Sequence, residues 1–285
     1  MGCAYSDVHL GGSWEYAMKK PDESFVLRTS ALPSLLESPA HFLAYYNQVW
    51  EDTQAMLFGR VAHVAALEPH KLSETIVTIP EDINLRTKEG RQQRDDILAS
   101  IKTGQELLKP SEANAAIKMA EVAKAGPFRE WIDYDNPRPL WEYELQWKDE
   151  TYGIDCGSRL DIYQPNQATI IDYKTTSSLK FFKKDIFSYH YHVKMAWQRQ
   201  ACLANGLEVD GVFLAAQEKK PPYACLMYEL TPEVLAWGWE LCCQAMETLN
   251  TAMAFDFWPC YVQEQAIQVE LPAWANREDN DNENY

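Results

Sequence analysis

The chain has 285 residues, of which 46% are hydrophobic and 24% are charged, so it can bury a sizeable core but is too short for more than two ordinary domains. Its 26 Lys and Arg residues against 42 Asp and Glu residues give a net charge of −16, which excludes a protein that holds nucleic acid by bulk positive charge. The charge is compatible with a nucleic-acid enzyme, because a metal site brings its own positive charge and basic residues can be concentrated locally.

The cysteine pattern predicts a reducing cytoplasm. The number of cysteines is odd, none stands in a CxxC pair, and no apolar leader segment opens the chain. An iron–sulfur cluster needs four gathered thiolates, and the wide spacing favours buried structural thiols instead. No apolar run approaches the roughly 20 residues of a spanning helix, so no membrane association is expected. The seven cysteines are Cys3, Cys156, Cys202, Cys225, Cys242, Cys243 and Cys260.

The first half of the chain is predicted to be helical. Residues 30–46 and 51–67 carry helix start signals followed by apolar residues at helical spacing. The second of these helices has acidic residues in its first turn and is expected to end near Pro69. Residues 71–136 are polar and largely helical, which predicts an inserted or peripheral helical layer.

From residue 140 the pattern changes to the period of two that is typical of strands. The segments LWEYELQWKD, TYGIDCGSRLDIYQ and ATIIDYKTT predict a three-stranded antiparallel meander, with a turn at Pro165 and Asn166. A helix at about 185–205, the strands VDGVFLAAQE and YACLMYEL, and a helix capped by Thr231 follow. Residues 277–285 are expected to be a disordered acidic tail.

Asp161, Asp172 and Lys174 interrupt two apolar strands and are the most informative polar residues. Residues two apart in a strand share a face, so Asp172 and Lys174 project together. If the hairpin closes symmetrically around residues 165–168, Asp161 lies opposite Asp172, with β-carbons about 5 Å apart. Adjacent carboxylates repel unless they are protonated, paired or bound to a cation, and hard oxygen ligands suit Mg²⁺ or Mn²⁺. A buried ion pair of Asp172 with Lys174 is the alternative interpretation.

Three further features favour a metal site that acts on phosphate. The preceding strand carries Glu142 and Glu144, of which Glu144 can supply a third carboxylate, and the helix at 51–67 offers His63 as an imidazole ligand. Ordinary solvated or core side chains are the alternative for these residues. Basic stretches at 84–94 and 173–184 predict a phosphate-tracking surface, with solvated faces as the alternative. The candidate DNA-binding residues there are Arg86, Lys88, Arg91, Lys180, Lys183 and Lys184.

A series of short segments resembles the PD-(D/E)XK nuclease superfamily and, within it, the RecE-type exonucleases, which include exodeoxyribonuclease VIII and phage relatives. The two aspartates with DYK are moderately specific alone, whereas the whole series in order is a strong resemblance. The series covers about residues 30–275. Its segments are SALPSLLESPAHFLAYY, FGRVAHVAALEP, LRTKEGR, GSRLDIY, IIDYKTT, DIFSYHYHVKMAWQ and LPAWA.

The resemblance implies an α/β (α+β) fold with a restriction-endonuclease-like core, in which a central mixed sheet is flanked by helices. A single nuclease domain is expected over residues 1–276, with the helical insertion at about 71–136. The implied metal ligands are His63, Asp161, Asp172 and the main-chain carbonyl of Tyr173. The implied catalytic residues are Asp161, Asp172, the catalytic lysine Lys174, and Glu144 as the acidic residue on the preceding strand.

The activity that the resemblance implies is hydrolysis of phosphodiester bonds with Mg²⁺ as cofactor and Mn²⁺ as its substitute. Linear double-stranded DNA would be degraded from its 5′ ends, leaving 3′ single strands for a single-strand annealing protein in recombination. A homo-oligomer that forms a ring-shaped tetramer, in the cytoplasm of a bacterium or a phage-infected cell, is also implied.

One departure from the family pattern affects the helix after the DYK strand. Family members usually carry Gln and, four residues later, Tyr, where this chain has Lys194 and Gln198. Positions four apart share a helix face, so Gln198 can take over the role of the amide and Lys194 can contact phosphate as a DNA-binding residue. The departure motivates an alternative function, a catalytically weakened scaffold that binds DNA ends in a recombination complex. An acidic inhibitor of a nuclease ranks last, because the informative carboxylates interrupt apolar strands.

Overall fold

The computed structural model describes residues 18–22, 24–49, 52–126, 128–129, 139–261, 266 and 268–271. The acidic tail that the sequence predicts from residue 277 lies outside these residues. Among the helices that are described, none combines the length and the apolar character needed to cross a membrane.

An antiparallel meander of three strands forms the centre of the fold. The second and third strands pair through Ile162 with Ile171 and Tyr163 with Ile170, across a 3-10 turn at Pro165–Gln167. This is the register of a hairpin that closes symmetrically around 165–168, so both the meander and its register are confirmed. The strands are β4 (Leu140–Asp149), β5 (Ile154–Gln164) and β6 (Thr169–Thr176).

Three more strands turn the meander into a six-stranded mixed sheet. β7 (Gly211–Glu218) pairs parallel to β6, β8 (Cys225–Glu229) pairs antiparallel to β7, and the short β1 (Leu27–Arg28) pairs parallel to β5. A parallel pair needs a long crossover connection. Between β6 and β7 that connection contains the 3-10 turn Leu179–Phe181 and the helices α7 (Phe182–Ser188) and α8 (Tyr191–Ala204). The expected central mixed sheet with flanking helices is confirmed.

Helices cover both faces of this sheet, because side chains from alternate strand positions are apolar on both sides. On one face, Ile171 and Tyr173 are buried with residues of α3 (Gln54–Leu67) and α6 (Pro110–Ala125). On the other face, Ile170 is buried with residues of α7 and α8. Each fully buried side chain of this size stabilises the fold by about 1.5–3 kcal/mol.

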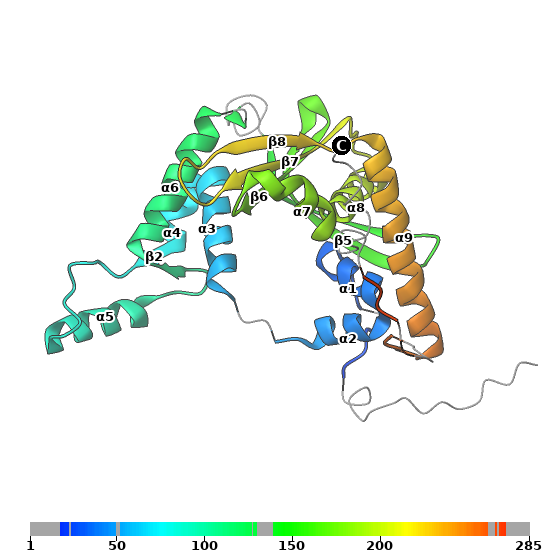
Figure 1. Ribbon diagram of the computed structural model, residues 1–285, viewed down its shortest axis with the longest axis horizontal. Helices are drawn as coiled ribbons and strands as arrows, with labels where there is room; N and C mark the ends of the chain where they lie inside the picture. Colours follow the sequence, from blue (N-terminus) through cyan, green and yellow to red (C-terminus); the bar gives the residue numbers. More distant parts are fainter. Residues whose placement is uncertain are drawn as a thin grey trace, which may run out of the picture.

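A third cluster joins the end of the sheet to the N- and C-terminal helices. The long helix α9 (Pro232–Phe255) packs against α8, where Gly238 allows the backbones to approach closely. The helices α1 (Leu32–Glu37) and α2 (Pro39–Asn47) complete the cluster. Figure 1 shows the result as an arch, with the sheet at its crown, α3 and α6 on one side, and α1, α2 and α9 on the other.

The segment expected to be a helical insertion contains helices and a small sheet. α6 packs against α3 in the core, whereas α5 (Lys88–Ser100) projects from the arch as an arm (Figure 1). The arm begins at a two-stranded parallel sheet of β2 (Ile76–Thr78) and β3 (Glu106–Leu108). The turn Pro69–Lys71 and the short helix α4 (Leu72–Thr75) lie between α3 and β2.

Three helix boundaries differ from the sequence prediction. The helix expected at 30–46 is divided at Ser38, whose extended backbone ends α1 and whose side chain caps α2. The expectation of acidic residues in the first turn of the second helix is wrong, because α3 begins at Gln54 and Thr53 caps it by accepting a hydrogen bond from the Met56 amide. Asp52 precedes the cap and binds Arg60 with both carboxylate oxygens at 2.8 Å. The helix expected at 185–205 is divided into α7 and α8 by His190, whose φ of 56° is left-handed.

Candidate active site

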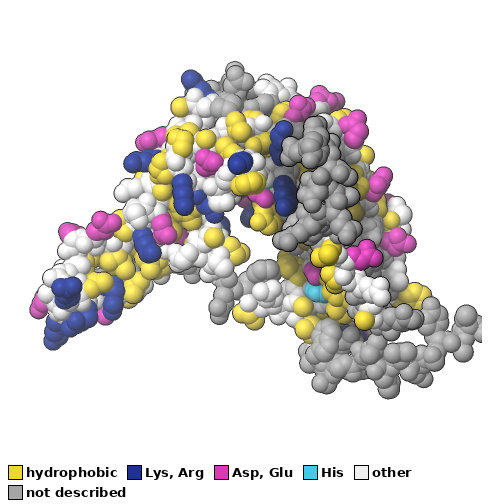
Figure 2. All heavy atoms as spheres, in the orientation of Figure 1, with side chains coloured by type: hydrophobic (Ala, Val, Ile, Leu, Met, Phe, Trp, Pro, Cys, Tyr) yellow, Lys and Arg dark blue, Asp and Glu magenta, His cyan; other side chains and the backbone are white. Residues whose placement is uncertain are grey.

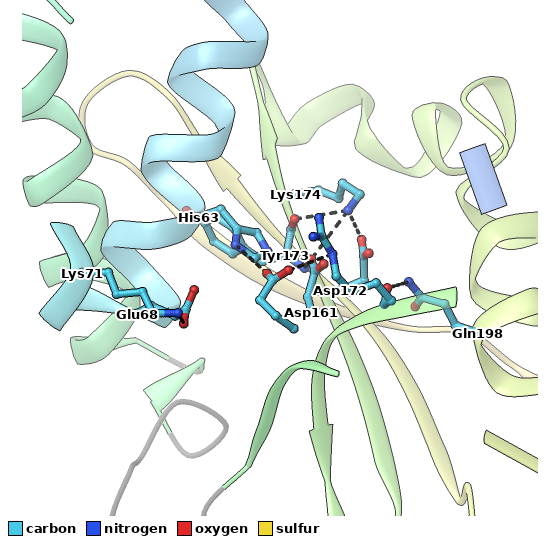
Figure 3. Close-up of polar contacts among 10 residues, drawn as sticks. His63, Glu68, Lys71, Asp161, Asp172, Tyr173, Lys174 and Gln198 are labelled. Carbon is cyan, nitrogen blue, oxygen red and sulfur yellow. Dashed lines mark hydrogen bonds and ion pairs between the residues drawn. The ribbon is translucent and has the colours of Figure 1, made fainter. Parts of the chain in front are cut away.

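Five elements bring polar side chains together at the edge of the meander. Figure 3 shows His63 on α3 pointing toward Asp161 on β5, with Lys174 and Asp172 on β6 beside them and Gln198 on α8 farther along. β4 contributes Glu142. Helix α3 fixes its histidine firmly, because the neighbouring Val61, Ala62, Ala65 and Ala66 are almost completely buried.

The strands β5 and β6 separate at the two aspartates. Their backbone pairing covers Ile162–Gln164 and Thr169–Ile171, one position short of Asp161 and Asp172. Beyond this point, Asp161 Oδ2 accepts a hydrogen bond of 2.9 Å from the amide of Tyr173. The carboxylate of Asp161 thus accepts a main-chain hydrogen bond where the backbone of β5 no longer does. This bond holds the aspartate at the point where β5 and β6 separate.

A backbone irregularity in β4 decides which glutamate faces the opening. Glu142 has φ of 48°, rare for a residue with a side chain, and it reverses the alternation of faces along the strand. Trp141 packs with the α3 and α6 cluster, but Tyr143, two residues later, packs with the α7 and α8 cluster. The register of the flanking pairs places Glu142 directly opposite Asp161. Glu144, which the sequence prediction selected, is exposed and pairs in register with Arg159.

His63 links the two carboxylates that face each other. Its Nδ1 lies 3.3 Å from Glu142 Oε1 and its Nε2 lies 3.0 Å from Asp161 Oδ2. Burial opposes protonation of the imidazole, but the charges of Asp161 and Glu142 outweigh burial and raise the pKa of His63. Burial also raises the pKa of Glu142, which pairs with Arg159 Nε at 2.9 Å.

Lys174 connects both aspartates. Its Nζ forms an ion pair with Asp172, lies 3.9 Å from Asp161 Oδ2, and donates a hydrogen bond of 3.3 Å to the carbonyl of Tyr173. Burial disfavours the ammonium, but Asp172 and Asp161 overcome it and raise the pKa of Lys174. Burial and the charge of Asp161 raise the pKa of Asp172. Burial also acts on Asp161, but Lys174 and His63 lower its pKa well below the usual range.

The two residues that depart from the family pattern take different positions on α8. Lys194 lies near the lysine of β6, and the ring of Tyr191 is 5.8 Å from Lys174 Nζ and 5.6 Å from Lys194 Nζ. Burial and the charge of Lys174 lower the pKa of Lys194, against the attraction of Asp172. Gln198 is buried and donates a hydrogen bond of 3.3 Å to the carbonyl of Arg159.

The other basic residues singled out from the sequence occupy two exposed locations. Arg86, Lys88 and Arg91 lie at the start of α5, in the arm, whereas Lys180, Lys183 and Lys184 lie on and before α7. Figure 2 shows that the space-filling surface is hollowed below the sheet, with Lys and Arg side chains along the hollow and at the tip of the arm. Many Asp and Glu side chains lie along the outer edge, so the net negative charge is unevenly distributed.

One group among the described residues has the composition of a cation site. His63, Glu142 and Asp161 each offer a ligand atom, and these atoms lie within 4.8 Å of one another. Two carboxylates and one imidazole, all half-buried, suit a divalent cation. The sequence prediction identified His63 and Asp161, and it missed Glu142 because a regular strand gives no reason to prefer it over Glu144.

Comparisons with known proteins concern the family and the fold of the chain. The profile of a family described as a PDDEXK-like domain of unknown function (DUF3799) matches residues 29–268. No curated protein matches the chain. The solved structure of a candidate exonuclease from Eubacterium rectale covers 82% of this chain and 88% of its own, with a TM-score of 0.53 and 14% identity, which shows a shared fold. A phage-related exonuclease from Haemophilus somnus covers 81% of this chain and 96% of its own, with a TM-score of 0.36 and 9% identity.

Proposed function

We propose that this chain, which belongs to the family of PDDEXK-like domains (DUF3799), is a divalent-metal-dependent exonuclease acting on linear double-stranded DNA. The observation that carries the proposal is the convergence of His63, Glu142 and Asp161 beside the ion pair of Asp172 with Lys174. Carboxylates that surround a cation site, next to a buried ammonium, form a site that suits a phosphodiester group. The four elements that bring these side chains together, α3, β4, β5 and β6, all lie within the matched residues 29–268.

Mg²⁺ is the proposed ion, with Mn²⁺ as a substitute. Glu142 and Asp161 supply the hard oxygen ligands that both ions prefer, and His63 supplies an imidazole. Asp172 and the carbonyl of Tyr173, which share Lys174 as a partner, are proposed to complete the site. When bound, the ion polarises a phosphate oxygen and lowers the pKa of water.

Lys174 is the proposed catalytic lysine. Because Asp172 and Asp161 raise its pKa, it stays an ammonium at neutral pH and acts as a fixed positive charge rather than as a base. Its Nζ can hold a phosphate oxygen and orient the attacking water while it offsets the charge that develops on the phosphate. Lys194, whose Nζ lies 5.6 Å from the same tyrosine ring that Lys174 approaches, is proposed to contact the phosphate as a second basic residue. Gln198 is proposed to position the site through the strand of Arg159.

The path of the DNA is proposed to follow the hollow of the arch (Figure 2). Exposed lysines of the α7 region would contact phosphates close to the site, and the basic start of α5 would contact the duplex farther away. These residues are Lys180, Lys183, Lys184, Arg86, Lys88 and Arg91. We propose degradation from 5′ ends, 3′ single strands that pass to an annealing protein, and a ring-shaped tetramer as further parts of this account.

A second candidate function is a scaffold that binds DNA ends with little or no turnover. The observation in its favour is Lys194, which stands where the resemblance expects an amide and whose Nζ lies against the same Tyr191 ring as Lys174 Nζ. A lysine can hold a phosphate by charge but cannot accept a hydrogen bond from water as an amide oxygen can.

The direct test uses purified protein with Mg²⁺, linear duplex DNA and a covalently closed circle of the same sequence. Wild-type protein is expected to shorten the linear duplex and leave the circle intact, and both EDTA and Asp172→Asn should abolish the loss. Gel-shift measurements on the same DNA distinguish the candidates. Binding of ends without turnover in Mg²⁺ or Mn²⁺ would support the scaffold, and neither binding nor turnover would contradict both functions.

A further inference from the structure

An exposed tyrosine stands at the corner between α7 and α8. Tyr189 is 59% exposed, although large aromatic side chains bury most of their surface when the fold uses them for packing. Its backbone is held in place, since its amide donates to the carbonyl of Asp185 and the next residue, His190, has the left-handed φ of 56°. The corner therefore presents the ring of Tyr189 outward on a fixed backbone.

A chain of ring contacts connects this tyrosine to the proposed active site. The ring centroids of Tyr189 and Tyr191 are 5.8 Å apart, and the Tyr191 ring lies 5.8 Å from Lys174 Nζ and 5.6 Å from Lys194 Nζ. The outer ring is thus two contacts, each shorter than 6 Å, from the ammonium proposed to hold the phosphate. These distances put the ring within the reach of a nucleotide whose phosphate is held at Lys174.

The helical segment that precedes Tyr189 carries side chains that favour a polyanion with flat apolar groups. Lys180, Lys183 and Lys184 are exposed on the preceding helical segment, and Phe181 among them is 58% exposed with Lys180 Nζ 5.4 Å from its ring. Positive charge interleaved with exposed aromatic rings is the combination that binds single-stranded nucleic acid, where bases stack on rings and phosphates contact lysines. A duplex buries its base faces within its own stack, so only an unpaired base can use such a ring.

We propose that Tyr189 is a stacking site for an unpaired nucleobase of the DNA strand whose phosphate lies at Lys174 and Lys194. The inference rests on the proposed nuclease function and deepens it, because it assigns to the corner of α7 and α8 the recognition of an opened DNA end. Base stacking on an aromatic side chain is sequence-tolerant, as degradation of arbitrary DNA requires.

The test uses full-length protein with Ca²⁺ in place of Mg²⁺ and duplexes that carry two unpaired nucleotides at the 5′ or the 3′ end. The terminal unpaired base is 2-aminopurine, whose fluorescence falls when it stacks on an aromatic ring. Wild-type protein is expected to quench the probe at one of the two ends. Tyr189→Ala should lose the quenching and bind that DNA about 10-fold more weakly, while Tyr189→Phe and Tyr189→Trp retain both properties.

Two controls keep the outcome specific. Phe255→Ala removes a ring that is 77% exposed on α9 and is expected to leave quenching and affinity unchanged. Tyr189→Leu keeps an apolar side chain without a flat ring, and it should behave as the alanine variant does. Circular dichroism and size-exclusion chromatography check that each variant keeps its fold and its assembly state.

Three results would overturn the inference. In the first, Tyr189→Ala quenches the probe as strongly as wild type does. In the second, wild-type protein quenches the probe at neither end. In the third, the substitution changes only the assembly state of the protein. Failure of the proposed function is separate. A wild-type protein that never cleaves DNA in Mg²⁺ but quenches the probe would refute the nuclease and not the stacking site.

Discussion

Replacement of Glu142 by glutamine tests which glutamate of β4 holds the cation. The substitution keeps the size of the side chain and an oxygen for Arg159, whose Nε lies 2.9 Å from Glu142 Oε2. It takes the charge of the three-residue group from −2 to −1 when His63 is neutral, and so removes half of the negative charge that attracts the ion. Substitutions in the outer shell of metal sites already cost about 10- to 100-fold in affinity, and a direct ligand should cost at least as much.

Isothermal titration calorimetry with Mg²⁺ and with Mn²⁺ measures the effect. Glu142→Gln is expected to weaken binding by about 10- to 100-fold, which corresponds to about 1.4–2.7 kcal/mol, and to slow DNA cleavage at limiting metal. Glu144→Gln is the matched control, since the same chemical change two residues away falls on an exposed side chain. Equal losses in the two variants, or a larger loss for Glu144→Gln, would refute the role that the irregular backbone of β4 gives to Glu142.

Three other predictions concern different parts of the account. Lys174→Met should reduce DNA cleavage by about 10²- to 10³-fold with little change in Mg²⁺ affinity, as measured by single-turnover kinetics and calorimetry, and an equal loss of both would contradict its role at the phosphate. In EDTA, the raised pKa of His63 means that its contribution to stability is complete below its unfolded pKa near 6.5 and is lost as pH rises through the folded pKa. The free energy of unfolding measured with urea should therefore decrease across that pH window in wild type and stay constant in His63→Gln. The same dependence on pH in both proteins would contradict the ion pairs of His63 with Asp161 and Glu142. Gly238→Ala should destabilise the fold by about 1–3 kcal/mol, because the new Cβ would lie 2.5 Å from a carbonyl oxygen of α8, whereas Gly59→Ala, with its nearest atom at 3.8 Å, should stabilise α3 by up to about 1 kcal/mol. A lower free energy of unfolding in both variants would contradict the difference in space that the structure gives to the two glycines.

The meander was predictable because its signals are local. The alternation of apolar residues and the turn at Pro165 set the register of β5 and β6, which pairs Ile162 with Ile171 as position arithmetic predicts. The same arithmetic placed Asp161 opposite Asp172, but the pairing of the two strands ends one position before these aspartates. The side chain of His63 comes from a distant helix, so the sequence offered it as an imidazole ligand but could not show which carboxylates it contacts. The structure adds the contacts of 3.0 Å and 3.3 Å that place it between two acids.

The choice between Glu142 and Glu144 was beyond local reasoning. In a regular strand both side chains share a face, and nothing in the letters shows that Glu142 adopts a positive φ. Tertiary packing on Trp141 and Tyr143, which enter different clusters, imposes the reversal. The break between α7 and α8 at His190 was missed for the same reason, since a left-handed residue without glycine gives no clear sequence signal.

A crystal of the protein soaked with Mn²⁺ and measured for anomalous scattering tests the central claim most directly. The account predicts a peak within coordination distance of His63, Glu142 and Asp161, with Glu144 outside its reach, and Lys174 Nζ beside the ion rather than among its ligands. A peak held by Glu144, or a clear data set with no peak among the three residues, would contradict the assignment of this site as the metal centre of a nuclease.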